Sequence, residues 1–309
     1  ASGSWQMYGV VFNTTDGDLE LSGTITGAYD ISTASYTQNF SVSSQVASPQ
    51  GVKFNTDGTK MFVVDSTGQD LTEYALTTGF DISTASFTRS ANINSGGESS
   101  PRGVAFNNDG TKMYVVGNGK TEVQEYDLST GFDISTASHA RQLAVGSQES
   151  AVRGITFNSD GTKLFIVGSG GDEVNEYALS TAFNVTTASH TTAFSVAGQE
   201  LIPEDIAFNT DGTKMYILGG SGDDVNEYNL TTGFNVSTAS YSQNFSVQSQ
   251  ESQPRGLAFS PDGTKMFICG ESGTDVNEYS IGTTAFPSGY HAAHTTTSTD
   301  SPYWTDINS

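Results

Sequence analysis

The sequence repeats itself with a period of about 51 residues, and this repeat constrains the fold more than any other feature. The tetrapeptide Asp-Gly-Thr-Lys begins at Asp57, Asp109, Asp160, Asp211 and Asp262, so the successive spacings are 52, 51, 51 and 51. A fixed period of this length is typical of arrays in which each unit packs against its neighbours. Dividing the 309 residues by the period predicts six units, five of them evident and a sixth assembled from the two ends of the chain.

Each unit has the pattern of four short β-strands. In the second unit an apolar run at residues 102–107 stops at Asn108-Asp109-Gly110, a hairpin signal because Asp and Gly accept positive φ. Residues 112–116, 122–128 and 139–145 are rich enough in β-branched and aromatic side chains for three more strands. No window sustains an apolar stripe at helical spacing, so we expect almost no helix.

A ring of such sheets explains how both faces of each unit are buried. One four-stranded sheet would expose Val, Phe, Met and Tyr on each face, whereas radial packing covers them with neighbouring sheets. We therefore predict an all-β fold, a six-bladed β-propeller with four antiparallel strands per blade. The aromatic residues expected to form a ring of contacts between the blades are Phe54, Phe106, Phe157, Phe208 and Phe259.

The two ends of the chain are expected to share one blade. Residues 5–8 align with 111–114 and residues 27–35 with 131–138, while residues 301–308 resemble the first strand of a unit. Three strands from the N-terminus and one from the C-terminus would close the ring and remove an exposed edge. The predicted single domain, 1–309, then has blades at 1–45 with 297–309, 46–97, 98–148, 149–199, 200–250 and 251–296.

The segment Ser260-Pro261-Asp262-Gly263-Thr264-Lys265-Met266-Phe267-Ile268 resembles the hairpin of YVTN-type and NHL-type β-propeller repeats. The resemblance covers nearly the whole chain and implies the propeller fold. That broad superfamily contains binders, scaffolds, lactonases and lyases, so the resemblance implies no single activity. The recurring Phe-Asp-Ile-Ser-Thr-Ala-Ser segments look like repeat arrays of marine bacterial surface proteins and phage-encoded proteins.

Composition limits the partners. The chain has 12 Lys and Arg against 34 Asp and Glu, a net charge of −22 that repels phosphate backbones and argues against nucleic-acid binding. It has no apolar run of transmembrane length, so we expect no membrane insertion. Abundant Ser, Thr, Asn and Gly with few Lys suits an extracellular, cell-surface or virion location, as part of a larger multidomain or virion assembly.

The informative positions are those where one unit departs from the others, because functional sites often break a structural rule. Three loops before a first strand carry an acid four residues ahead of an arginine, and we interpret Glu98 with Arg102, Glu149 with Arg153 and Glu251 with Arg255 as ion pairs within the loop. The fourth unit replaces the arginine by acid, and the first carries Gln50. These loops belong at one mouth of the central channel, and a ligand site is predicted there from Arg102, Arg153, Glu200, Glu204, Asp205 and Arg255. The alternative is that these charges form exposed pairs of little energetic value.

A calcium site is a second hypothesis. Hairpins on the same face carry carboxylates beside Gly at Asp172, Asp223, Asp224 and Asp275, and calcium prefers such oxygen ligands. The spacing does not match an EF-hand loop, and solvated acidic loop tips are the alternative reading.

Three functions remain open from the sequence. The first is a non-catalytic binding or adhesion module that recognises carbohydrate or a surface receptor through loops of constant length. The second is a propeller enzyme, a polysaccharide lyase or lactonase, that works at the channel mouth through Glu200, Glu204 and Asp205. The third is a scaffold or spacer without a ligand. No catalytic residue is assigned, because no serine lies in a nucleophile-elbow motif and no acid-base pair is inserted into the loops.

Overall fold

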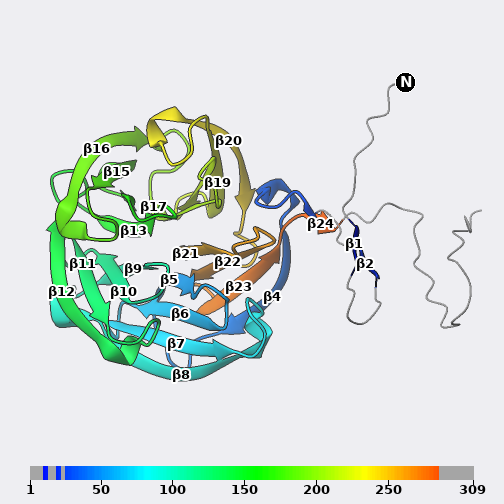
Figure 1. Cartoon of the computed structure of the whole chain (residues 1–309), viewed down its shortest axis with the longest axis horizontal. Helices are drawn as coiled ribbons and strands as arrows, with labels where there is room; N and C mark the ends of the chain where they lie inside the picture. Colours follow the sequence, from blue (N-terminus) through cyan, green and yellow to red (C-terminus); the bar gives the residue numbers. More distant parts are fainter. Residues whose placement is uncertain (1–9, 13–18, 22–24, 285–309) are drawn as a thin grey trace, which may run out of the picture.

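The computed structural model describes residues 10–12, 19–21 and 25–284. These residues contain five four-stranded antiparallel sheets arranged around a central axis (Figure 1). The fold is a β-propeller, as predicted. The only helices among the described residues are 3-10 turns of three residues each, and none is long and apolar enough to cross a membrane.

The strands of each blade follow one another from the axis outward. The first blade contains β5 (Pro49–Phe54), β6 (Lys60–Asp65), β7 (Asp70–Leu76) and β8 (Ala85–Asn92). The second contains β9 (Pro101–Phe106), β10 (Lys112–Gly117), β11 (Glu122–Leu128) and β12 (Ala137–Ala144). The third contains β13 (Val152–Phe157), β14 (Lys163–Gly168), β15 (Glu173–Leu179) and β16 (Ala188–Ser195). The fourth contains β17 (Pro203–Phe208), β18 (Lys214–Gly219), β19 (Asp224–Leu230) and β20 (Ala239–Ser246).

The fifth blade closes the ring with a strand from the other end of the chain. It contains β21 (Pro254–Phe259), β22 (Lys265–Gly270) and β23 (Asp275–Ser280), and its outermost strand is β4 (Ser35–Ser41). The pairing of β23 with β4 is antiparallel, with Val276 opposite Phe40. Two further pairs, β1 (Val10–Phe12) with β2 (Leu19–Leu21) and β3 (Ile25–Thr26) with β24 (Thr283–Thr284), lie outside the five blades.

The prediction of six blades with a shared N-terminal sheet is wrong for the described residues. Closure does combine three strands with one, but the single strand comes from the N-terminal side and completes the fifth unit. Residues 27–282 number 256, close to five periods of 51, so dividing the full length by the period counted residues that do not belong to the ring. The segments 5–8 and 301–308, which were aligned with strands of a sixth blade, lie outside the described residues.

The repeated Asp-Gly and Phe-Asp-Ile-Ser-Thr segments each have a local structural role. In the first blade, Gly58 has φ +72°, and the Asp57 carboxylate accepts the Thr59 amide at 3.0 Å across the hairpin. After the third strand, Asp81 caps the 3-10 turn Ile82–Thr84 by accepting the Ser83 amide at 3.1 Å, and Ile82 is buried. The same turn recurs at Ile31–Thr33, Ile134–Thr136, Val185–Thr187 and Val236–Thr238, and another 3-10 turn lies at Asn94–Gly96.

The core lies between neighbouring blades, and its regular feature is an aromatic contact at each interface. The phenylalanine that ends each inner strand packs on an aromatic ring of the second strand of the preceding blade. The pairs, with centroid distances of 4.5–4.8 Å, are Phe54 with Phe267, Phe106 with Phe62, Phe157 with Tyr114, Phe208 with Phe165 and Phe259 with Tyr216. The predicted aromatic ring is confirmed.

Closure through β4 can be tested with an engineered disulfide. Ser35 and Ser280 lie directly opposite each other in the β4–β23 pair, so we expect Ser35→Cys with Ser280→Cys to form an intramolecular disulfide under mild oxidation. The bond would close a loop of more than 200 residues and stabilise the fold by about 5–6 kcal/mol in the chain-entropy estimate. The matched control is Ser240→Cys with Ser280→Cys, because Ser240 holds the equivalent place in the outer strand of the fourth blade. Mass spectrometry of the linked peptides distinguishes the two, and linkage of the control pair alone would contradict the five-bladed closure.

Candidate functional site

The starts of the five inner strands bring five polar side chains to one mouth of the channel. The second residue of each inner strand differs between blades: Gln50, Arg102, Arg153, Glu204 and Arg255. Four of these were predicted site residues, and we refer to Arg102, Arg153, Glu204 and Arg255 as the arginine cluster.

Glu204 is the centre of the arginine cluster. Its side chain is buried, and Arg153 Nη1 donates to both of its carboxylate oxygens at 2.6 and 2.7 Å. Arg255 Nη1 donates to Oε1 as well, and Arg102 Nη1 lies 3.8 Å from Oε2. A buried carboxylate is stable in a propeller channel when charged donors of this kind surround it.

A second set of residues holds the arginines in place. Glu271 accepts from Arg255 Nη2 at 2.9 Å and from Gln50 Nε2 at 2.7 Å, while Gln50 Oε1 accepts from Arg102 Nη1 at 2.8 Å. Burial would lower the pKa of Arg255, but the carboxylates of Glu204 and Glu271 raise it. Burial, together with the charge of Arg153, lowers the pKa of Arg102. Arg102 is therefore the guanidinium least neutralised by the cluster.

Asp205 lies one layer deeper, where the other four inner strands have glycine. Its Oδ2 accepts from Lys53 Nζ at 3.0 Å and from the Leu257 amide at 2.9 Å, and its Oδ1 accepts from the Ile206 amide at 2.8 Å. Burial raises the pKa of Asp205, although Lys53 and the amides favour its charged form. Since β21 lies between β5 and β17 in the ring, the Lys53–Asp205 pair reaches across the channel.

Glu200 is not part of this site. Its carboxylate accepts from the amides of Ile202, Ser221 and Gly222 at 2.6–3.1 Å, so it fixes the loop against the neighbouring hairpin. Glu98, Glu149 and Glu251 accept backbone amides in the same way. The interpretation of these acids as partners of the arginines four residues later is wrong, because buried amide donors of the hairpin occupy both carboxylate oxygens.

In the first blade, a carboxylate from the second strand accepts the loop amides in place of the loop glutamate. Val46 occupies the position of the loop glutamate, and Asp65 occupies the position where the other blades have glycine at the end of the second strand. Asp65 accepts from the amides of Ala47, Ser48 and Thr67 at 3.0–3.1 Å. Each blade therefore supplies one carboxylate to this loop, from the loop itself or from the second strand.

The residues expected to bind calcium belong to three different blades. Asp172 and Asp223 have φ of 51° and 49° at the hairpin tips, a conformation that Asp tolerates better than most residues. Asp224 accepts from Asn226 and Asn244 at 2.7 and 2.6 Å, and Asp275 accepts from Asn277 and Asn39 at 2.7 and 2.5 Å. Among the described residues no group of three or more His, Cys, Asp and Glu is placed to hold a metal ion. Calcium binding at these loops stays a prediction.

Sequence reasoning missed Lys53, Gln50 as a partner of Arg102, and Glu271. A signal for Lys53 was present, because the other inner strands carry Ala105, Thr156, Ala207 and Ala258 at the same position. The rule that departures from the repeat mark a site would have found Lys53 if it had been applied inside the strands as well as in the loops.

A family model described as "Lactonase, 7-bladed beta-propeller" matches residues 51–234, more than half of the chain. The chain belongs to this lactonase family. The matched residues run from β5 to the segment after β19 and include three members of the arginine cluster. The family description gives seven blades, whereas the described residues of this chain form five.

Several solved structures are similar to this lactonase-family chain, and no curated protein matches it. A Bacteroides uniformis protein, described as a candidate 6-phosphogluconolactonase, matches with a TM-score of 0.49 and 12% identity over 88% of this chain and 72% of its own. A protein of unknown function from Desulfotomaculum acetoxidans matches with a TM-score of 0.45 and 14% identity over 72% of this chain. The match covers 62% of the Desulfotomaculum protein, so the chain spans less than two thirds of the length of that structure.

The two ways of supplying the loop carboxylate lead to a swap experiment in the fourth blade. We expect Glu200→Val to destabilise the protein by about 2–4 kcal/mol, because three amides lose their acceptor. Adding Gly219→Asp should recover most of that loss, since it reproduces the arrangement of Val46 and Asp65. Gly219→Asp alone should destabilise, because a Cβ there would lie 2.0 Å from Glu200 Oε2. Urea unfolding measures the free energy of unfolding of all three variants. A double variant no more stable than Glu200→Val would show that an aspartate at position 219 cannot replace the loop glutamate.

Proposed function

We propose that this protein hydrolyses a lactone at the mouth of its channel, with the arginine cluster as the reacting site. The observation that carries the proposal is the convergence of three partly exposed guanidiniums on the single carboxylate of Glu204. Membership of the lactonase family supports the same reaction class. The substrate class is a sugar lactone, whose ring ester and hydroxyl groups suit a polar site.

The chemistry follows from the charges of the cluster. The reaction adds water to the ring ester and gives a hydroxy acid. Negative charge develops on the carbonyl oxygen as water attacks, and donors placed beside that oxygen stabilise the transition state. Arg102 is suited to this role because its direct charge partner, Glu204, lies 3.8 Å away. Glu204 would accept the proton of the attacking water and return it to the ring oxygen, which leaves as a hydroxyl group when the ring C–O bond breaks.

A second candidate is a non-catalytic module that binds carbohydrate or a receptor on a cell surface or virion. The observation that favours it is the pairing of Glu204, since both of its oxygens already accept from Arg153. A carboxylate held in this way stabilises the mouth without acting as a base. In that case the exposed loops would carry the function.

Lactone hydrolysis distinguishes the two candidates. With glucono-δ-lactone as the probe, we expect acid release above the buffer rate in a pH-stat assay, and a fall in kcat/KM of about 100-fold in Glu204→Gln, typical of loss of a general base. Arg102→Met should also lower kcat/KM, because the oxyanion loses a charged donor. The control is Glu122→Gln, which removes one negative charge from a partly exposed hairpin acid, as Glu204→Gln does at the mouth. A rate equal to that of buffer would reject the enzyme and leave the binding module, which a glycan-array screen of the same preparation then tests.

A further inference from the structure

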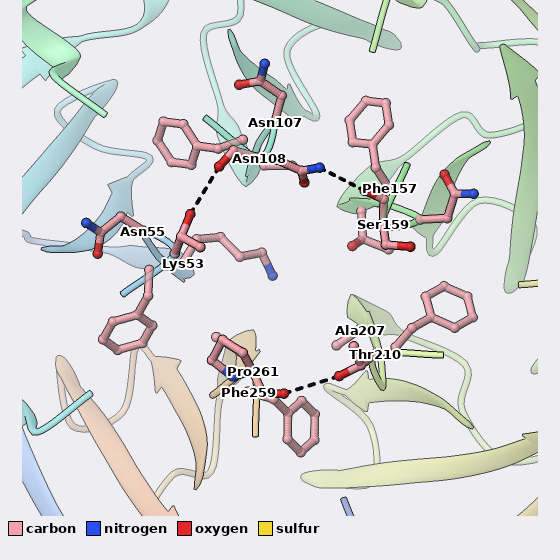
Figure 2. A pocket seen from close by; sticks show the side chains of 18 of the residues that line it. Lys53, Asn55, Asn107, Asn108, Phe157, Ser159, Ala207, Thr210, Phe259 and Pro261 are labelled. Carbon is pink, nitrogen blue, oxygen red and sulfur yellow. Dashed lines mark hydrogen bonds between the residues drawn. The ribbon is translucent and has the colours of Figure 1, made fainter. Parts of the chain in front are cut away.

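The opposite end of the channel opens into a cavity of about 340 Å³ on the face formed by the hairpins between first and second strands. Small side chains create its width, because Ala105, Thr156, Ala207 and Ala258 line it from four blades. The first blade carries Lys53 at the equivalent position, and its side chain points into the cavity (Figure 2). Cavities of this size are in the range that binds small molecules.

Lys53 has a donor left for a ligand among the contacts that the structure describes. Its Nζ donates to Asp205 Oδ2 at 3.0 Å and to the Leu257 carbonyl at 2.7 Å, whereas an ammonium group has three donors. Only 18% of the side chain is exposed. The repeat needs neither residue for its strands, since the other blades carry Gly at the position of Asp205 and Ala or Thr at the position of Lys53.

The rim of the cavity is polar and held in a fixed arrangement by contacts between hairpins. Asn108 Nδ2 donates to the Ser159 carbonyl at 2.9 Å, and Thr210 Oγ1 donates to the Pro261 carbonyl at 3.2 Å (Figure 2). Asn55, Asn107 and Asn158 also line the cavity. Each donates an amide hydrogen to a threonine hydroxyl of its own hairpin at 3.2 Å, and Figure 2 shows the Asn55 and Asn107 amides directed away from the centre of the cavity. At the rim, Asn108 uses one of its two amide hydrogens among the described contacts, which leaves the other for a ligand. A carbonyl has two lone pairs, so the rim offers both donors and acceptors.

The charges at this end select a neutral ligand. The hairpin residues that line the cavity are followed directly by Asp57, Asp109, Asp160, Asp211 and Asp262. The hydroxyl of the following threonine lowers the pKa of Asp57, Asp109, Asp160 and Asp211, so these carboxylates are ionised at neutral pH and repel an anion. The Lys53 ammonium disfavours a cation inside the cavity. Hydroxyl groups, which donate and accept, match the rim without carrying charge.

We propose that this cavity is a binding site for a neutral, hydroxyl-rich ligand of monosaccharide or disaccharide size, with Lys53 donating to a ligand oxygen. The site lies at the other end of the channel from the arginine cluster, and the Lys53–Asp205 pair separates the two. It does not depend on lactone hydrolysis, and either proposal can fail while the other stands.

The test is saturation-transfer NMR with methyl glucoside, methyl mannoside, methyl galactoside and N-acetylglucosamine, with sodium gluconate as the charged comparison. We expect saturable millimolar binding of at least one neutral sugar and weaker binding of gluconate. Ala207→Leu fills the cavity without changing a charge and should abolish binding, whereas Ala75→Leu, an exposed alanine outside the cavity, should leave it unchanged.

A second variant tests the proposal even where Ala207→Leu prevents folding. Lys53→Ala with Asp205→Gly gives both positions the residues of the other blades, and binding should weaken about tenfold, as expected for loss of one charged donor. The proposal is overturned if no neutral sugar binds saturably, if gluconate binds more tightly than every neutral sugar, or if Ala207→Leu and the double variant both bind like the wild type.

Discussion

Five inner strands must approach one axis so closely that no side chain fits between them at one level, and the rest of the structure depends on this constraint. A Cβ on Gly51 would lie 2.6 Å from the Arg102 carbonyl, and one on Gly256 would lie 2.7 Å from the Gly51 Cα. Glycine permits such an approach of backbones. The single exception is Asp205, whose carboxylate accepts from the Leu257 amide of the next inner strand and from Lys53 of the strand beyond it.

This layer divides the channel into two ends with different chemistry. Above it, Glu204 and three arginines concentrate charge at the mouth, where we propose that a lactone binds. Below it, four small side chains leave a cavity, and the cation that lines this cavity is Lys53, the partner of Asp205 in the glycine layer. Residues that break the repeat in the first and fourth blades, Gln50, Lys53, Glu204 and Asp205, therefore determine the properties of both ends.

The sequence predicted the architecture because the repeat carries it locally. The Asp-Gly hairpins, the four strands and the aromatic contacts between blades all follow from residues within one unit and its neighbour. The number of blades does not follow from one unit and its neighbour. It depends on which terminal segment pairs with β23, and pairing across the ends of a chain leaves no local signal in the sequence.

The candidate site was predictable only in part. Departures from the repeat correctly gathered Arg102, Arg153, Glu204 and Arg255, because equivalent positions in a propeller face the same axis. The partners of the arginines were not predictable. Four-residue spacing suggested pairs such as Glu98 with Arg102. In the structure, backbone amides donate to Glu98, and Arg102 lies near Glu204 of another blade instead. Which donor reaches a carboxylate depends on the loop conformation and on contacts between blades, and neither can be read from spacing.

The Lys53–Asp205 pair links two inner strands that are not neighbours in the ring, and a double-mutant cycle of unfolding free energies measures how strongly it stabilises the axis. Lys53→Ala and Asp205→Gly should each destabilise by about 3 kcal/mol, because each leaves the other member of a buried pair without its partner. The loss of unfolding free energy in the double variant should be about 2 kcal/mol smaller than the sum of the two single losses. Additive losses, with no coupling between the two positions, would show that the pair does not stabilise the ring at its axis.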